Sequence, residues 1–362
     1  MEKLNVLVVD DSLIYRKILT DAINKTSNAK TNNFASNGFN ALEKIQNSND
    51  FDVVLMDIFM PGLTGVETLK IIKEKYPEIE VVLISSGDDN TARMTVEALE
   101  NGAFDFILKP NSDNLERNML FIRNKLNSIF NQIKVKKISE IEFEKEKKME
   151  IISEKIQKKE KTIISTPKII LIASSTGGPS ALDKLFIKLN KSIKTPIIIT
   201  QHMPEKFTQI LAQSLKSKTK MNFVEVQENE EICEGKIYIA AGGKHLYLEK
   251  IENKIIAKYK NDDPIINVKP SADVLFKSLT NVYDKNTNIL AVILTGMGND
   301  GEKGIKHLKE NLKCYCITQN EKSCVVYGMP MRVEKAGFSD ESLDIEIIGN
   351  RISKIISGDF NG

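Results

Sequence analysis

Two stretches of this chain alternate short apolar runs with longer segments of helical period, and this alternation limits the possible folds more than any other feature. The first stretch extends from Leu4 to about residue 127, and the second begins at Lys168. The apolar runs are rich in Val and Ile, as the strands of a parallel sheet are. Because strands and helices take turns along the chain, each stretch predicts an α/β domain with a doubly wound parallel sheet.

The expected strands are short in both domains. In the first domain they are Leu4–Val9, Val53–Met56, Val81–Ile84 and Phe106–Leu108. In the second domain they are Ile169–Ile172, Ile197–Ile199, Ile237–Ala240, Ile289–Leu294 and Cys314–Thr318.

The segment between the two stretches has a different composition. Residues 128–167 are rich in Lys, Glu and Ile, and neither Gly nor Pro occurs before Pro167. Such a charged segment buries little apolar surface. It predicts a partly helical, solvated linker between domains at 1–127 and 168–362, with a short coiled coil as the alternative.

The charge balance and the cysteines exclude several classes of protein. Lys and Arg total 51 against 49 for Asp and Glu, so the net charge of +2 gives no general attraction to nucleic acid or acidic membranes. No apolar stretch approaches the roughly 20 residues that cross a bilayer, and the N-terminus lacks the pattern of a signal peptide. The four cysteines match neither a zinc site nor a redox pair. We expect a cytoplasmic protein with buried, reduced thiols, no nucleic-acid partner and no membrane insertion.

Acidic residues stand at the expected strand ends of the first domain. Asp10 and Asp11 follow the first strand, and Asp57 follows a later one. Parallel strands present their carboxyl ends at one edge of the sheet, where ligands bind. Clustered carboxylates need a cation, and oxygen ligands of this kind suit Mg²⁺. Ser85 and Lys109 follow two further strands and would offer a hydroxyl and an ammonium group to a phosphoryl group on Asp57.

This arrangement resembles the receiver domain of two-component response regulators, over roughly Lys3 to Asn127. The resemblance implies a flavodoxin-like fold with Asp57 as the phosphoacceptor. The matching segments are Val8-Val9-Asp10-Asp11-Ser12, Leu55-Met56-Asp57-Ile58-Phe59-Met60-Pro61-Gly62-Leu63-Thr64-Gly65 and Gly102-Ala103-Phe104-Asp105-Phe106-Ile107-Leu108-Lys109-Pro110.

The receiver resemblance also implies roles for the surrounding residues. Mg²⁺ would be held by Asp11, Asp57 and the carbonyl oxygen of Phe59, with Asp10 acting through water. The residues that respond to phosphorylation would be Ser85, Phe106 and Lys109.

The second domain carries a turn of small residues directly after its first strand. The segment Ala173-Ser174-Ser175-Thr176-Gly177-Gly178-Pro179 leads into a stretch of helical period. Its glycines, and a Pro at a first helical position, indicate a tight strand-to-helix turn. A serine there would lie near helix N-terminal amides, which stabilise developing negative charge. The same turn could instead bind a phosphate, as dinucleotide-binding domains do.

A serine nucleophile needs a base, and the chain contains three histidines. His202 follows an expected strand, His245 follows paired glycines, and His307 lies in a helical segment, so His202 has the most favourable position. Asp300 follows another strand in a glycine-rich loop. It could orient the imidazole, although it could also cap the next helix. Ser175, His202 and Asp300 therefore predict a hydrolase site at one edge of the sheet.

From about Lys168 to Ser353 the chain resembles the catalytic domain of the chemotaxis protein-glutamate methylesterases. The resemblance implies a Rossmann-like domain that hydrolyses γ-glutamyl methyl esters on methyl-accepting chemoreceptors, often with deamidation of receptor glutamines. The matching segments are Ser174-Ser175-Thr176-Gly177-Gly178, Gln201-His202-Met203-Pro204, Tyr238-Ile239-Ala240-Ala241-Gly242-Gly243, Pro270-Ser271-Ala272-Asp273-Val274-Leu275-Phe276, Leu294-Thr295-Gly296-Met297-Gly298-Asn299-Asp300-Gly301 and Ser323-Cys324-Val325-Val326-Tyr327-Gly328-Met329-Pro330.

The methylesterase resemblance implies Ser175 as the nucleophile, His202 as the base and Asp300 as the orienting acid. Thr176 and the Met297 amide would position the substrate and form the oxyanion hole. No metal or other cofactor is expected for ester hydrolysis. A chemotaxis histidine kinase would be the phosphodonor, and the unphosphorylated receiver would cover the hydrolase cleft.

Two other functions fit parts of the sequence. A non-catalytic signalling adaptor would bind receptors or kinase, but it would not need Ser175, His202 and Asp300 together. A DNA-binding regulator would need a small module with a concentrated basic helix, and the second domain has no such helix pattern. We therefore expect a phosphorylation-controlled methylesterase, with the adaptor as the alternative.

Overall fold

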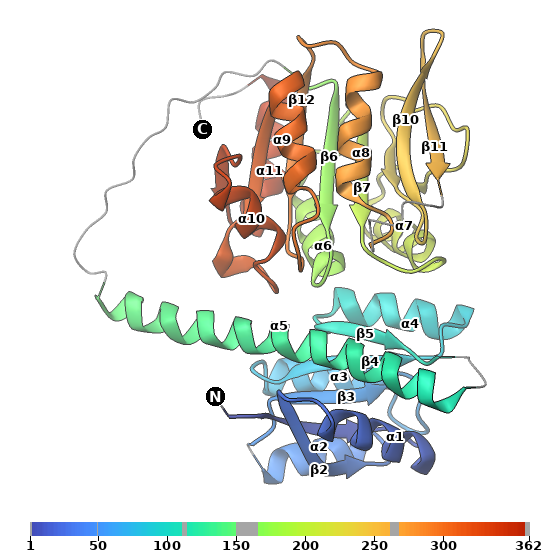
Figure 1. Ribbon diagram of the computed structural model, residues 1–362, viewed down its shortest axis with the longest axis vertical. Coiled ribbons are helices and arrows are strands. Elements are labelled where there is room, and N and C mark those ends of the chain that lie inside the picture. Colours follow the sequence, from blue (N-terminus) through green and yellow to red (C-terminus); the bar gives the residue numbers. More distant parts are fainter. Residues whose placement is uncertain (1, 49, 111–113, 150–165, 261–267, 359–362) are drawn as a thin grey trace. The chain divides into compact units, whose positions relative to one another are not determined.

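The computed structural model describes residues 2–48, 50–110, 114–149, 166–260 and 268–358. The chain divides into two compact units, Met1–Lys155 and Ile156–Gly362 (Figure 1). Each unit is built on a parallel sheet flanked by helices, so the predicted α/β fold class is confirmed. Among the residues described, no helix combines the length and the apolar character needed to cross a membrane.

The first unit is a five-stranded parallel sheet with the strand order β2-β1-β3-β4-β5. The order reverses between β1 and β3, and ligands of such sheets bind at the carboxyl ends near the reversal. The strands are β1 (Leu4–Val9), β2 (Ala29–Ala35), β3 (Val53–Asp57), β4 (Glu80–Ser85) and β5 (Asp105–Leu108). The helices are α1 (Leu13–Asn24), α2 (Gly38–Asn47), α3 (Gly65–Lys75), α4 (Asp89–Glu100) and α5 (Leu115–Met149).

The edge strand β2 was not among the expected strands. Its sequence, Ala-Lys-Thr-Asn-Asn-Phe-Ala, buries only Ala29, Thr31 and Ala35. An edge strand has a neighbour on one side only, so it does not need the continuous apolar run of a central parallel strand. The apolar pattern used to find strands is therefore weak here.

Helix α5 packs against the rest of the first unit at residues well beyond the expected domain boundary. Phe130 and Ile133 are fully buried, and Lys136 forms an ion pair of 2.5 Å with Glu80. The boundary expected at residue 127 therefore falls inside α5. Residues 128–149 of the expected linker are helical, and residues 150–165 lie outside the described part of the chain.

The second unit is a seven-stranded parallel sheet with the strand order β14-β13-β12-β6-β7-β9-β8. Its strands are β6 (Ile169–Ser174), β7 (Ile197–Gln201), β8 (Phe223–Glu225), β9 (Ile237–Ile239), β12 (Asn288–Ile293), β13 (Lys313–Gln319) and β14 (Glu341–Leu343). Its helices are α6 (Gly178–Lys188), α7 (Phe207–Thr219), α8 (Ala272–Ser278), α9 (Glu302–Asn311), α10 (Met329–Lys335) and α11 (Ile345–Ser357).

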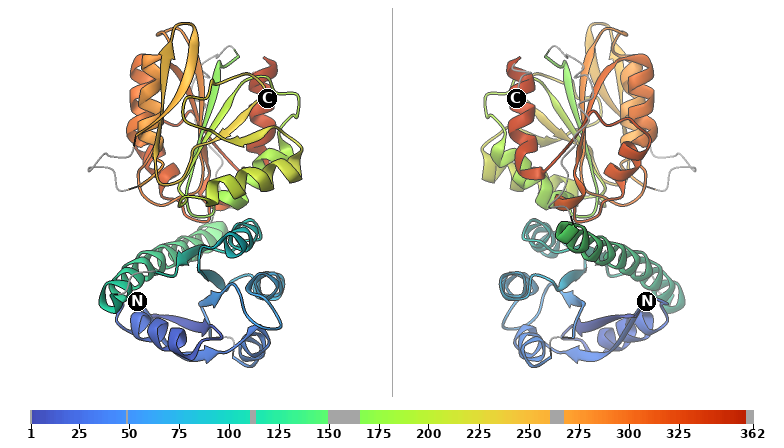
Figure 2. Two further views of the ribbon diagram at one scale, coloured as in Figure 1. Left: turned by 90° about the vertical axis from the view of Figure 1, so that its right-hand side faces the viewer. Right: turned by 90° about the vertical axis from the view of Figure 1, so that its left-hand side faces the viewer.

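Helices cover both faces of the second sheet. Helices α8 and α9 pack together on one face, and α6, α7 and α11 cover the other (Figure 2). An antiparallel hairpin of β10 (His245–Ile251) and β11 (Lys254–Lys260) packs beside α8. This hairpin was not among the expected strands. The second domain is a parallel sheet with an added antiparallel element.

Candidate functional site

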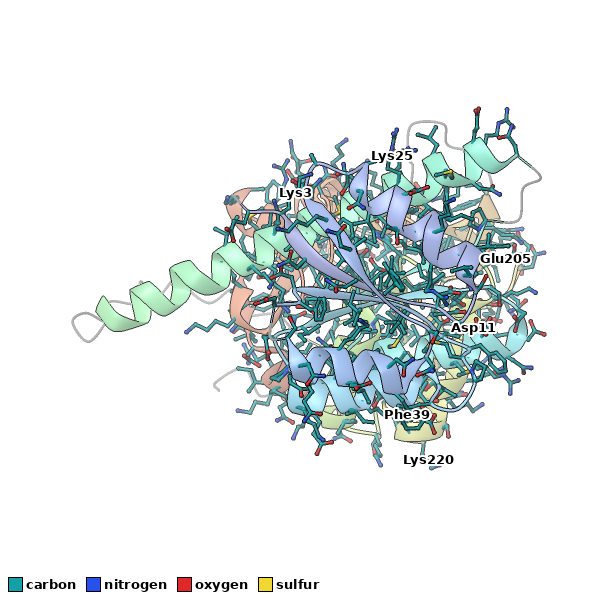
Figure 3. The ribbon with its side chains drawn as sticks, turned by 90° about the horizontal axis from the view of Figure 1, so that it is seen from below. Lys3, Asp11, Lys25, Phe39, Glu205 and Lys220 are labelled. Carbon is teal, nitrogen blue, oxygen red and sulfur yellow. The ribbon has the colours of Figure 1, made fainter. Side chains whose placement is uncertain are left out.

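The carboxyl ends of β1 and β3 bring three acidic residues together in the first unit. These strands are parallel neighbours, so Asp10 and Asp57 leave the sheet side by side. Both are buried, whereas Asp11 is exposed, and one oxygen of each lies within 4.8 Å of the others. Figure 3 labels Lys3 and Asp11 at the two ends of β1. The structure therefore forms the acidic cluster that the sequence predicts.

The electrostatics of this cluster favour a bound cation. Burial raises the pKa of Asp10, and the charge of Asp57 raises it further. Burial also raises the pKa of Asp57, and Lys109 opposes that shift only in part. A divalent cation would offset the unfavourable burial of negative charge. The carboxylate donors are hard oxygen ligands, so the residues present fit Mg²⁺.

Lys109 directly follows β5 and forms ion pairs with two carboxylates of the cluster. Its Nζ lies 2.9 Å from Asp57 Oδ2 and 3.3 Å from Asp10 Oδ2. The ammonium group also lies 4.4 Å from the ring centre of Tyr15, a cation–π contact. The predicted positive partner of Asp57 is thus already in place beside the carboxylate.

The other receiver residues named from the sequence have different environments. Ser85 ends β4 and is fully buried, and its Oγ accepts a hydrogen bond of 3.0 Å from Thr95. Phe106 lies in β5 and is half-buried. The Phe59 side chain is exposed and carries no oxygen ligand, so its main-chain carbonyl is the part of this residue that can bind Mg²⁺.

We expect Asp10→Asn to stabilise the receiver domain at neutral pH by about 1 kcal/mol. Because the pKa of Asp10 is raised in the folded domain, there is a pH range in which folded Asp10 keeps its proton while Asp10 in the unfolded chain has lost it. The stability of the wild type therefore falls as pH rises from the ordinary aspartate pKa through the raised one. Thermal unfolding with and without Mg²⁺ tests this, because Mg²⁺ should stabilise the wild type more than the variant. An Asp10→Asn domain less stable than the wild type at pH 7 without Mg²⁺ would contradict it; exposed Asp50→Asn is the control.

In the second unit, three neighbouring strands carry the predicted catalytic residues. β12, β6 and β7 are adjacent at the centre of the sheet. Ser175 follows β6, His202 follows β7, and Asp300 lies in the loop between β12 and α9. Because the strands are parallel, their carboxyl ends share one edge of the sheet. All three residues therefore lie on that edge.

The imidazole of His202 is hydrogen-bonded to the carboxylate of Asp300, with 2.7 Å between Nε2 and Oδ2. The carboxylate also accepts from Ser271 Oγ (2.8 Å) and from the amides of Ala272 (2.6 Å) and Asp273 (2.9 Å). Burial would raise the pKa of Asp300, but the hydrogen bond and charge of His202, with the α8 amides, hold it below its ordinary value. An ionised Asp300 requires the Nε2 proton of His202, so the acceptor of neutral His202 is Nδ1.

Asp300 and Asp273 cap each other's helices. Asp300 precedes α9 but accepts from the first amides of α8. Asp273 lies in α8 and accepts from the amides of Gly301 (3.0 Å) and Gly304 (2.6 Å) at the start of α9. The alternative role considered for Asp300, capping the following helix, thus belongs to Asp273. Ser271 and Asp273 had no predicted role, although Ser and Asp near a helix start are a capping signal.

Ser175 lies in the tight turn between β6 and α6. Gly177 has a φ of 78° and precedes α6, as the predicted turn requires. A Cβ on Gly296 would lie 2.7 Å from the Ser175 Cβ, so only glycine allows this approach. Among the described residues, the hydrogen bonds of Ser175 involve its main chain, including 3.0 Å from its N to Thr295 O. The structure therefore does not join the Ser175 hydroxyl to His202.

Of the two residues predicted to position the substrate, Thr176 lies in this turn and Met297 lies on a segment that contacts it. The carbonyl of Thr176 accepts a hydrogen bond of 3.0 Å from Thr295 Oγ1. Met297 follows Gly296, and its side chain is 45% exposed. The amide of Gly296 is anchored by the carbonyl of Val326 at 2.9 Å, which fixes the loop in front of Met297.

The remaining histidines and the cysteines have other surroundings. His245 begins β10 and is buried, and His307 in α9 is hydrogen-bonded to Thr280 at 3.1 Å. His202 is thus the histidine that the structure joins to Asp300. All four cysteines are free, with Cys316 fully buried and the other three partly buried. Burial raises the pKa of the Cys314 thiol to about 12 and also raises the pKa of the Cys324 thiol, so the expectation of buried thiols is confirmed for Cys314, Cys316 and Cys324.

Comparisons with known proteins match both units. A family model described as the response regulator receiver domain matches residues 6–120, and one described as CheB methylesterase matches residues 170–352. The solved catalytic domain of the CheB methylesterase of Thermotoga maritima is 37% identical, with a TM-score of 0.50, and covers 52% of this chain and 99% of its own. The chain is therefore a response regulator whose output domain is a carboxylic-ester hydrolase.

Relatives over the full length define the family. Proteins of Desulfotalea psychrophila (36% identical, covering 97% of this chain and 98% of their own) and Thermotoga maritima (35%, 98% and 98%) are both named protein-glutamate methylesterase/protein-glutamine glutaminase. The chain belongs to the CheB methylesterase family. The alternative of a non-catalytic adaptor gains no support from these matches.

Proposed function

We propose that this protein hydrolyses glutamate γ-methyl esters on methyl-accepting chemoreceptors to glutamate and methanol, and that it deamidates receptor glutamines at the same site. One observation supports this most directly. Ser175, His202 and Asp300 lie at the carboxyl ends of three adjacent strands, and His202 is held by Asp300 at 2.7 Å. The substrate class is proposed from the name of the relatives. Ser175, His202 and Asp300 are the residue types that acyl transfer uses.

In the proposed reaction, Ser175 Oγ attacks the ester carbonyl carbon while its proton moves to Nδ1 of His202. Asp300 accepts the Nε2 proton in a hydrogen bond and stabilises the imidazolium that forms. The oxyanion is held by main-chain amides, for which Met297 and the Thr176 turn are the candidates. His202 then returns the proton to the departing oxygen, and methanol leaves. A water molecule gives a proton to Nδ1 and attacks the acyl carbonyl carbon. The bond to Ser175 Oγ then breaks, Nδ1 returns the proton to that oxygen, and glutamate leaves.

The contact between Ser175 and His202 is the part of this arrangement that the structure does not contain. Catalytic hydrogen bonds are often long or misaligned before substrate binds. We propose that this contact forms when the ester is bound.

We propose further that Asp57 accepts a phosphoryl group from a chemotaxis histidine kinase in the cytoplasm. Mg²⁺ would be held by Asp11, Asp57 and the Phe59 carbonyl, with Asp10 acting through water, and it would neutralise the carboxylates and the phosphoryl oxygens. Lys109 already lies 2.9 Å from the Asp57 carboxylate and would pair with the phosphoryl group.

Ser85 and Phe106 are the proposed responders to this phosphorylation. The Ser85 hydroxyl, now hydrogen-bonded to Thr95, would turn to the phosphoryl oxygens, and Phe106 would move with it. We propose that the unphosphorylated receiver restrains the hydrolase domain and that phosphorylation shifts the equilibrium toward the active form.

The test is methanol release from membranes that contain methylated chemoreceptors, by the full chain with and without acetyl phosphate. We expect the rate to rise roughly tenfold with the phosphodonor, as coupling of a few kcal/mol produces. The Asp57→Ala protein should keep its basal rate and lose the rise. A wild-type protein that releases no methanol in either condition would contradict the proposed substrate, and a rise that persists in Asp57→Ala would contradict the proposed phosphorylation site.

A further inference from the structure

The side chain of Gln201 lies between the candidate nucleophile and the candidate base, and the mechanism above does not use it. Gln201 is the last residue of β7 and is 2% exposed. Its Oε1 accepts a hydrogen bond of 2.6 Å from Ser174 Oγ. Its Nε2 donates to the carbonyls of Ser175 (3.0 Å) and His202 (3.3 Å). One carboxamide therefore holds the main chain at both of these residues.

The hydrogen bonds of Gln201 begin where the main-chain hydrogen bonds between β6 and β7 end. The register of β6 and β7 ends with Ser174 opposite Gln201, and a hydrogen bond of 3.0 Å from His202 N to Ser174 O is the last main-chain link between them. Beyond it, each chain turns away into its own loop. The Gln201 side chain extends the link by one residue, to the carbonyl of Ser175 itself.

The surroundings of Gln201 fix the position and the orientation of its amide. A Cβ on Gly178 would lie 1.9 Å from Gln201 Oε1, so the glycine at the start of α6 provides the space for the carboxamide. The carbonyls of Ser175 and His202 can only accept, so the group between them must carry two hydrogens. A flipped amide would turn its oxygen toward both carbonyls.

We propose that Gln201 is a positioning residue of the hydrolase site: its carboxamide sets the distance between the Ser175 turn and the His202 backbone. This role rests on the proposed function of Ser175 and His202. Gln201 does not touch the reacting atoms, so its loss should disturb alignment rather than remove a reacting group. A misplacement of about 1 Å in a catalytic pair lowers the rate by roughly 100-fold.

Two variants of similar size separate the roles of Gln201. Gln201→Met fills the same space without hydrogen bonds. Gln201→Glu keeps the shape, but an ionised carboxylate cannot donate to the carbonyls of Ser175 and His202, whereas a protonated carboxyl can donate to one of them. Burial against two carbonyl oxygens should raise the pKa of the new carboxyl.

The experiment measures kcat and KM of the full-length variants for methanol release from methylated receptor membranes, at several pH values. We expect Gln201→Met to lower kcat by about 10-fold to 100-fold with little change in KM. The rate of Gln201→Glu divided by that of the wild type should rise as pH falls, while the same ratio for Gln201→Met stays flat. Dividing by the wild-type rate removes the titration of His202 from the comparison.

Thr200→Val is the matched control on the same strand. Thr200 precedes Gln201, is fully buried, and its hydroxyl has no hydrogen-bond partner among the described residues. Its replacement should leave kcat within about twofold. A Gln201→Met protein with wild-type kcat, or a Gln201→Glu ratio that does not change with pH, would overturn the positioning role. A wild type that releases no methanol would overturn the proposed function instead.

Discussion

A Ser175→Ala protein is expected to release methanol from methylated chemoreceptors roughly 10⁵-fold more slowly than the wild type, because the acyl-enzyme cannot form without the hydroxyl. The loss should appear in kcat, since the substrate still meets the same surface. Phosphorylation of Asp57 should not restore the rate. The fold should be unaffected, because the hydrogen bonds of Ser175 to other described residues use its main chain.

The neighbouring Ser174→Ala protein is the control for this substitution. Ser174 also carries a hydroxyl, but it is fully buried and hydrogen-bonded to Gln201. Its loss weakens only one side of the Gln201 link, so the rate should fall by about tenfold at most. If Ser175→Ala released methanol at the wild-type rate, or if Ser174→Ala were the more damaging change, the nucleophile would be assigned to the wrong residue.

An Asp300→Asn protein should be slower than the wild type by about 10³-fold to 10⁴-fold, with an intact fold at neutral pH. The carboxylate accepts from His202 Nε2 and from Ser271, Ala272 and Asp273, whereas an amide has one oxygen. An amide nitrogen that faces His202 would donate to Nε2. The imidazole would then carry its proton on Nδ1 and could not accept one from the nucleophile.

The same variant should change the stability of the second domain at acid pH. The pKa of Asp300 lies below its ordinary value in the folded protein, so its charge stabilises the fold above the ordinary aspartate pKa. This contribution is lost as pH falls through the lowered pKa, and Asp300→Asn should lack that change. Thermal unfolding over a pH series measures this change in stability.

The exposed Asp284→Asn protein is the control for the rate and should match the wild type. An Asp300→Asn rate within tenfold of the wild-type rate would contradict the triad.

The chemistry at the strand ends could be predicted because strand identity and residue type are local properties of the sequence. Asp10 and Asp57 each follow an apolar run, and so do Ser175, His202 and Asp300. Parallel strands bring such positions to one edge without any further information. The residues that surround them could not be placed in the same way. Edge strand β2 and the β10–β11 hairpin carry weak apolar patterns, and both were missed.

The sequence by itself determined the two parallel-sheet domains, the acidic cluster and the placement of Ser175, His202 and Asp300 at one sheet edge, because each depends on a residue's position relative to its own strand. Only the tertiary structure decided how those residues are held. Asp300 accepts hydrogen bonds from Ser271 and the first amides of α8 across 27 to 29 positions of sequence, and Gln201 links to Ser174 across 27. It also decided that Nε2 of His202 faces Asp300, across 98 positions. These contacts join segments that are far apart in the sequence, so no local pattern encodes them.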